Sequence, residues 1–157
     1  MIASAIETFP NECWGCCMGD RRNGKGVIVA CLPYQVAARR RTSVSSPSSD
    51  MFKRLLAKGR YARACEFHSH AHSPPSRIPL GDYLWPSKDD LLCAGRGRAE
   101  IIVEVMRSSR NASFLRKRGR KLAAAMGRFR LLMGAFTYLG KYEGEMVHDE
   151  PDLRILG

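Results

Sequence analysis

The sequence predicts a single α/β domain in which a mixed, curved β-sheet is flanked by helices. The chain has 157 residues, a length that suits one domain. Its hydrophobic content of 45% and charged content of 26% are those of an ordinary folded protein. Short apolar or β-branched runs alternate along it with segments of helical spacing, which is the pattern of a domain built from both strands and helices.

The N-terminal part is predicted to form a short helix and a hairpin. Residues 2–10 favour a helix that Pro10 ends. Residues 13–18 are apolar and punctuated by glycine, and they lead into a Gly-Asp-Arg-Arg-Asn-Gly segment that is typical of a turn. Residues 26–32 are β-branched and predict a buried strand. We therefore expect residues 13–32 to form a β-hairpin.

The middle of the chain alternates between loops, helices and a strand. Residues 42–50 predict a polar Ser/Pro loop, and the helical spacing after it predicts a helix that ends near Gly59. Residues 64–70 predict a strand. Residues 73–86 hold four prolines and predict a long loop. Ser87 is a suitable N-cap for a helix with acidic residues in its first turn.

The C-terminal part is predicted to hold two strands with a surface helix between them. Residues 100–106 predict a clear strand. Residues 113–126 combine a basic face with an apolar face, which predicts a helix. Residues 128–139 predict a strand, with a helix as the alternative. Residues 141–157 hold five acids and two bases, so we expect a domain over residues 1–140 followed by an acidic tail.

The net charge of +11 suggests an acidic partner, such as nucleic acid or an acidic protein face. Much of the charge lies in three clusters, at residues 39–41, 53–63 and 116–121. A surface that binds polyanions and a set of solvated faces explain these clusters about equally well. Aromatic residues, on which single-stranded nucleic acid would stack, are scarce around them. Nucleic acid is therefore kept as a partner that is not favoured.

Hydropathy and cysteine spacing limit the class of protein further. No apolar run approaches the ~20 residues of a membrane-spanning helix, and the N-terminus lacks the regions of a secretory signal. We therefore expect a cytoplasmic protein that does not enter a membrane. Cys13 and Cys16 are spaced like half of a zinc knuckle, but no second pair follows at finger spacing. The six cysteines are expected to be reduced and mostly buried.

The stretch Phe67-His68-Ser69-His70 is the most informative for chemistry. Strand side chains alternate between faces, so His68 and His70 are expected to project to one side. Two adjacent imidazoles can hold a metal, and a hydrolytic zinc site needs a third ligand and an open position for water. Asp90 lies one turn into the predicted helix and shares a face with Ser87. Taken alone, the two histidines are better explained as strand residues bonded to the backbone.

Three motif blocks together resemble the JAMM (MPN-type) metalloproteases. The first is His68-Ser69-His70 and the second is Ser87-Lys88-Asp89-Asp90, which together give the HxH…SxxD pattern. The third is the upstream Pro10-x-Glu12-x-x-Gly15-x-x-x-Gly19 pattern, which supplies an acidic residue. The blocks follow the family's order and span residues 9–90. The resemblance implies the MPN fold, a mixed curved sheet of cytidine-deaminase-like architecture.

The resemblance also implies a role for each motif residue. His68, His70 and Asp90 would bind one catalytic Zn²⁺, with water in the fourth position. Glu12 would act as the general base and pass the proton to the leaving amine. Ser87 would donate a hydrogen bond to the developing oxyanion. The family's usual substrate is a peptide or isopeptide bond at the C-terminal glycine of ubiquitin or a ubiquitin-like modifier, so a stand-alone, prokaryotic-like enzyme acting on such conjugates is expected.

One feature departs from the family pattern. Residues 71–86 make a sixteen-residue connection between the HxH and SxxD blocks, longer than is usual in the family. Either this loop bulges and still brings Ser87 and Asp90 to the histidines, or the match fails. His72 extends the alternation of histidines, although Pro74-Pro75 favours a place behind the ligands or in solvent. Two rival functions remain, a non-catalytic scaffold of the same fold and a basic nucleic-acid-associated protein.

Overall fold

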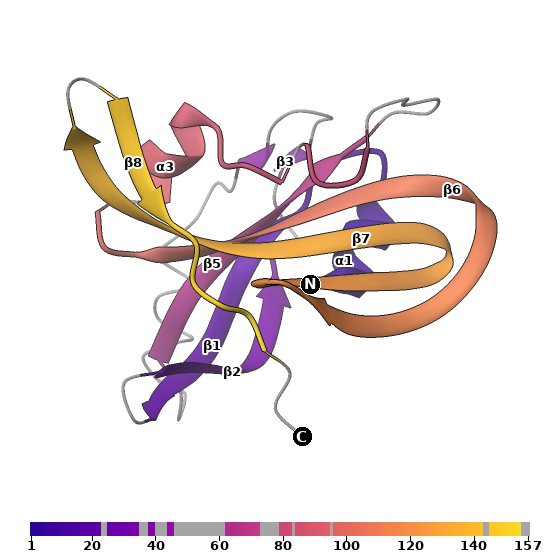
Figure 1. Ribbon diagram of the computed structural model, residues 1–157, viewed down its shortest axis with the longest axis horizontal. Coiled ribbons are helices and arrows are strands. Elements are labelled where there is room, and N and C mark those ends of the chain that lie inside the picture. The colour runs from indigo at the N-terminus through magenta and orange to yellow at the C-terminus, as the bar shows by residue number, and fades with distance from the viewer. Residues whose placement is uncertain are drawn as a thin grey trace.

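The protein forms an α/β structure around one six-stranded mixed sheet (Figure 1). The computed structural model describes residues 1–22, 25–34, 38–39, 44–45, 62–72, 79–82, 84–94, 96–142 and 145–154. The elements in chain order are α1 (Ile2–Thr8), β1 (Trp14–Arg22), β2 (Lys25–Pro33), β3 (Ala38–Arg39), β4 (Val44–Ser45), β5 (Ala62–Ala71), α3 (Lys88–Ala94), β6 (Ala99–Arg118), β7 (Lys121–Tyr142) and β8 (Glu145–Asp149). The mixed sheet that the sequence predicts is confirmed.

The sheet is open, with the order β2-β1-β5-β6-β7-β8. Strands β5 and β6 pair in parallel, and the other neighbours pair antiparallel. A parallel pair needs a crossover connection, and this one carries α3. Strands β3 and β4 form a separate two-stranded sheet.

The predicted N-terminal helix and hairpin are confirmed as α1 and the β1–β2 pair. The prediction that residues 26–32 are buried is wrong, because β2 is an edge strand on which Val29 and Leu32 are 44% and 41% exposed. Strand β1 runs on to Arg22 because the polar turn segment pairs with β2 down to Lys25. Close packing explains the two motif glycines here. A Cβ added at Gly15 would lie 2.5 Å from the Phe67 ring and against the Leu32 carbonyl, and one at Gly19 would collide with the Val27 carbonyl.

Two apolar clusters lie on opposite faces of the sheet. Alternation along β6 sends Ile101 and Val103 to the cluster that includes Ala5 of α1, and it sends Ile102 to the other cluster. The second cluster includes Leu84 from the crossover segment, which lies against Ile102 and Phe136. Helix α1 therefore covers one face, and the segment leading to α3 covers the other.

The prediction of a helix over residues 113–126 is wrong, because this segment forms the far half of the β6–β7 hairpin. Ser113 pairs with Met126, and Arg118 pairs with Lys121 across a tight turn. Gly119 supplies the left-handed backbone of that turn, with φ of 62°. Leu115 and Met126, which give the segment its helical spacing, are 49% and 54% exposed. Cross-strand pairing has therefore overridden helix propensity.

The structure confirms the other predicted strands and adds one strand in the C-terminal segment. Strands at residues 64–70, 100–106 and 128–139 and a helix after Ser87 are confirmed. Residues 145–149 of the acidic segment form β8 at one edge of the sheet. The segment then returns along the hairpin, where the Leu153 N–H donates to the Arg120 carbonyl at 2.8 Å.

Several predictions lie outside the described residues. They are the helix that ends near Gly59, most of the 42–50 loop and most of the basic clusters at residues 39–41 and 53–63. Cys13, Cys16, Cys17, Cys31 and Cys65 are free, and all of these except Cys31 are buried as expected. Among the described helices, none is long and apolar enough to span a membrane.

Candidate metal centre

His68, His70 and Asp90 converge on one point above the sheet. The two histidines project from the same face of β5, and their Nε2 atoms lie 2.8 Å apart. Asp90 approaches from α3, with Oδ1 3.5 Å from His68 Nε2 and Oδ2 3.6 Å from His70 Nε2. In the described part of the chain, no other group of His, Cys, Asp or Glu side chains gathers three metal-ligating atoms within 4.8 Å.

Glu100 fixes the orientation of His68, a role that the sequence did not reveal. Glu100 Oε1 lies 2.7 Å from His68 Nδ1, and both residues are buried. In the parallel register His68 pairs with Ile102, so Glu100 stands on the same face one step along β6. Because Nδ1 is held by this carboxylate, Nε2 points toward Asp90. The signal in the sequence is a pair of acids, Glu100 and Glu104, within the apolar run that begins β6.

The long connection between the motif blocks still brings Asp90 to the histidines. Ser87 and Asp90 form a reciprocal cap at the start of α3. The Asp90 N–H donates to Ser87 Oγ at 3.2 Å, and the Ser87 N–H donates to Asp90 Oδ2 at 2.7 Å. This cap aims the Asp90 carboxylate at the two imidazoles. Leu84, fully buried against the sheet, anchors the segment that leads to the cap.

Of the places that the sequence left open for His72, the structure shows neither a ligand position nor one in solvent, since the side chain is buried beside the cluster. Its Nε2 lies 2.5 Å from Glu104 Oε1, and both side chains are buried. The other oxygen of Glu104 accepts the Gly81 N–H at 2.6 Å. His72 and Glu104 therefore tie the crossover segment to β6 beside the cluster.

Glu12 is held near the cluster by the residue that follows it. The Cys13 N–H donates to Ser69 Oγ, and the Ser69 N–H donates to the Cys13 carbonyl, each at 2.9 Å. Ser69 is fully buried between the two histidines of the motif. These two hydrogen bonds hold the chain at Glu12 alongside β5. Burial raises the pKa of the Glu12 carboxyl, which the charges of the nearby His68 and His70 oppose.

The carboxylates around the cluster favour a positive charge at its centre. Burial lowers the pKa of His68, but hydrogen bonds to Asp90 and Glu100 outweigh this effect and raise the pKa to about 10. Burial opposes ionisation of Asp90, yet its hydrogen bonds to His68 and His70 hold its pKa well below the usual range. Without a metal, a proton on His68 balances these carboxylates. A divalent cation that displaced that proton would meet the same favourable field.

The donor set suits a catalytic rather than a closed structural metal site. Two imidazole nitrogens and one carboxylate oxygen are common ligands of zinc in hydrolases, which keep a further position open. The side chains of His70 and Asp90 are 16% and 23% exposed, so the cluster is accessible to solvent from their side. The arrangement could therefore hold a metal ion together with water.

Comparisons with known proteins give no independent identification. No protein-family model matches the chain, and a search of curated proteins found no match. The candidate site therefore rests on the geometry of His68, His70 and Asp90 and on the motif blocks in the sequence.

Proposed function

We propose that this chain is a zinc-dependent metallopeptidase that hydrolyses a peptide or isopeptide bond at the C-terminus of a ubiquitin-like modifier. The observation that carries the proposal is the convergence of His68, His70 and Asp90, with the partly buried Glu12 held alongside. These four residues are among the five that the motif blocks single out, and the fifth is Ser87. Two of the blocks lie on β5 and α3, which the long crossover separates in sequence.

In this proposal His68, His70 and Asp90 hold the zinc, and Glu100 keeps His68 Nε2 directed at it. Zinc bound there would lower the pKa of its water to about 7 and would polarise the substrate carbonyl. Glu12 takes a proton from the attacking water and delivers it to the leaving nitrogen. Its raised pKa suits this work, because a carboxylate that ionises closer to neutral pH is a better proton acceptor.

Ser87 serves as the oxyanion donor in this scheme. Its Oγ already accepts the Asp90 N–H. A hydroxyl that accepts one hydrogen bond retains its own hydrogen to donate. Ser87 is exposed beside the ligand that it orients, so its hydroxyl can face a carbonyl oxygen on the substrate. Capping of α3 and stabilisation of the oxyanion are therefore compatible roles.

The sheet edge offers a place for the extended tail of such a modifier. Strand β2 is an edge strand, and an extended peptide can add to an edge through main-chain hydrogen bonds. Its Pro33 end pairs with Gly15, which follows Trp14, the partner of His68. A tail added to β2 would therefore run toward the candidate centre.

Metal analysis and one matched variant test the proposal. Purified wild-type protein should retain about one zinc per chain and cleave a fusion joined to the C-terminal glycine of a ubiquitin-like protein. Glu12→Gln should keep the zinc and lose the cleavage, because the amide cannot accept the proton. A wild-type protein that binds no zinc contradicts the proposal. Retained zinc with no cleavage of any amide substrate favours a non-catalytic scaffold instead.

A further inference from the structure

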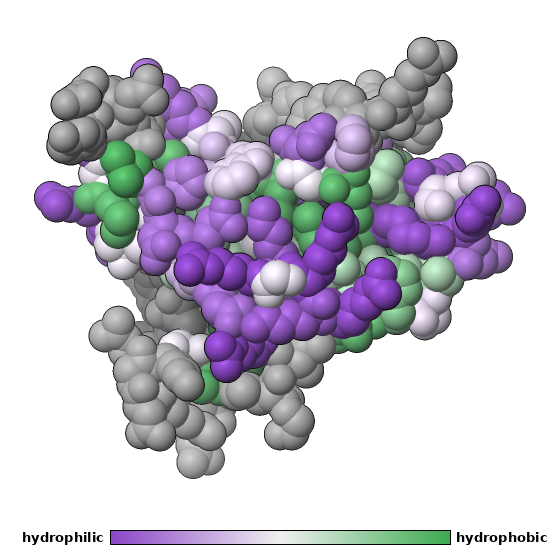
Figure 2. All heavy atoms as spheres, in the orientation of Figure 1, coloured by the Kyte–Doolittle hydropathy of each residue, from purple (hydrophilic) through white to green (hydrophobic). Residues whose placement is uncertain are grey.

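The far half of the β6–β7 hairpin is a strongly cationic ribbon. Residues 107–130, which we call the basic ribbon, hold nine Lys or Arg residues and no Asp or Glu. They are Arg107, Arg110, Arg116, Lys117, Arg118, Arg120, Lys121, Arg128 and Arg130. Figure 2 shows hydrophilic side chains over much of the face that carries this hairpin. The candidate metal centre uses none of these cations.

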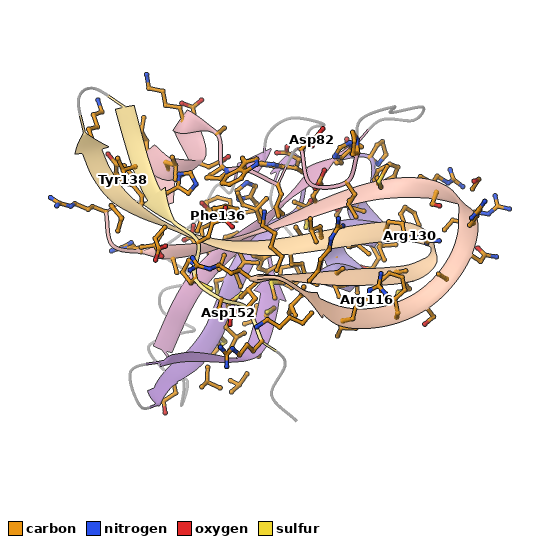
Figure 3. All side chains as sticks on the ribbon, viewed as in Figure 1. Asp82, Arg116, Arg130, Phe136, Tyr138 and Asp152 are labelled. Atoms are coloured by element: carbon orange, nitrogen blue, oxygen red, sulfur yellow. The ribbon has the colours of Figure 1, made fainter. Side chains whose placement is uncertain are left out.

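The acidic C-terminal segment neutralises only the tip of the basic ribbon. Lys117 Nζ lies 2.9 Å from Asp152, and Lys121 Nζ lies 3.7 Å from Glu150. The Arg120 guanidinium is 3.9 Å from Asp149 and also donates to the Glu150 carbonyl. No described carboxylate pairs with the six remaining arginines, at positions 107, 110, 116, 118, 128 and 130. Figure 3 shows Arg116 and Arg130 on the part of the hairpin away from Asp152.

Five of the six unneutralised arginines are exposed along a two-stranded antiparallel ribbon, whereas Arg130 is half-buried and donates to three backbone carbonyls. Arg116 and Arg118 are two residues apart on β6 and therefore share one face, where Arg118 stands opposite Lys121. Both arginines are exposed. Guanidinium groups bind phosphate oxygens through paired, charge-assisted hydrogen bonds. The spacing and exposure of these side chains fit a repeating phosphodiester backbone.

We infer that the basic ribbon binds duplex DNA through its phosphate backbone. Single-stranded nucleic acid is bound mainly by stacking bases on open aromatic rings. The ribbon has only two aromatic residues and no row of open rings, because Phe129 packs edge-on against Phe9, and Arg116 lies 4.8 Å from the centroid of Phe114, which is 37% exposed. Because Ala123, Ala124 and Ala125 of β7 are buried, the exposed β6 side of the ribbon meets the phosphates of a duplex without entering a groove.

The acidic segment competes with DNA for the tip. Its three carboxylates form ion pairs with Lys117, Arg120 and Lys121. These three cations extend the row of cations on the same hairpin. A chain with Asp149→Asn, Glu150→Gln and Asp152→Asn keeps the shapes of these side chains but removes their charge. We expect this variant to bind duplex DNA about threefold to tenfold more tightly, with a steeper dependence on salt.

Fluorescence anisotropy with a labelled duplex of about 20 base pairs tests the inference in the full chain. Wild-type protein should bind at about 50 mM salt, and its affinity should fall steeply as salt rises. Arg116→Glu with Arg118→Glu should weaken binding at least about tenfold and reduce the salt slope by about two. The control, Arg98→Glu with Lys141→Glu, makes the same change in net charge at exposed sites outside the ribbon and should lose much less.

Four results would overturn the inference. They are no binding of duplex DNA at low salt, equal losses in the ribbon and control variants, tighter binding of a single strand or of duplex RNA, and equally tight binding of poly-glutamate. Far-UV circular dichroism and thermal unfolding establish that each variant is folded. Zinc content and the effect of Glu12→Gln belong to the proposed peptidase, so failure of either activity is recognised separately.

Discussion

His68 Nδ1 and Glu100 Oε1 lie 2.7 Å apart in the interior of the sheet. This pair joins the strand that carries the histidines to its parallel neighbour, β6. A carboxylate at Nδ1 fixes the imidazole tautomer and ring orientation, and it increases the basicity of Nε2. His68 is therefore set up as a ligand before any metal arrives, while His70 and Asp90 lie closer to solvent.

Removing this carboxylate should weaken metal binding. Glu100→Ala is expected to lower zinc affinity about 10-fold to 100-fold, because His68 loses its orienting partner. Glu100→Gln should lose less, since the amide oxygen can still accept a hydrogen bond from Nδ1. A competition titration with a chromophoric chelator measures both effects, with Glu7→Gln as an exposed control that should match wild type. Unchanged affinity in Glu100→Ala would show that the pair does not act on the metal.

The raised pKa of His68 predicts how the metal-free protein responds to pH. Folding raises this pKa from its ordinary value of 6.5 to about 10, so the protonated imidazole is favoured in the folded state. Its stabilisation is complete below about pH 6.5 and is lost as pH rises through about 10. With chelator present, the free energy of unfolding should fall by on the order of a few kcal/mol across this interval.

Urea titrations at a series of pH values measure this effect. His68→Asn provides the comparison, because the amide cannot carry the proton, so its unfolding free energy should change less over the same interval. Added zinc should flatten the wild-type profile, since a bound metal takes the place of the proton. A wild-type stability that rises between pH 6.5 and 10 would contradict the assignment.

The sequence was sufficient to locate the candidate ligands. His68 and His70 follow from strand alternation, and the resemblance to the HxH…SxxD pattern adds Asp90, which lies on a capped helix. These predictions depend only on the geometry within one strand or within one turn of a helix. The sixteen-residue connection could not be judged in this way. Its outcome depends on tertiary anchors, the burial of Leu84 and the hydrogen bond from Gly81 to Glu104.

The features that the sequence could not predict depend on contacts between distant segments. The role of Glu100 depends on the parallel register of β5 and β6, which no spacing within either strand reveals. The segment 113–126 has the residues of a good helix, but pairing between its own two halves across Gly119 makes it a hairpin. Both cases depend on which strands become neighbours.

Ser69 should control the position of Glu12. Ser69→Ala removes the acceptor of the Cys13 N–H and leaves that buried group unsatisfied, which costs about 1–3 kcal/mol. We expect lower stability, retained zinc and a reduced rate of hydrolysis, because the chain beside Glu12 loses one of its two bonds to β5. Ser108→Ala removes an exposed hydrogen bond to the Arg110 N–H and serves as the control. Zinc loss in Ser69→Ala would place its effect on the ligands rather than on Glu12.

Gly15 should tolerate no side chain, because two strands and an aromatic ring meet at its Cα. A Cβ there would lie 2.5 Å from the Phe67 ring and against the Leu32 carbonyl of β2. Gly15→Ala is therefore expected to lower the free energy of unfolding by about 1–3 kcal/mol. Gly26 on β2 has open space around it, so Gly26→Ala is the matched control and should change stability by less than about 1 kcal/mol. Chemical denaturation of both variants would contradict this packing if Gly15→Ala proved as stable as Gly26→Ala.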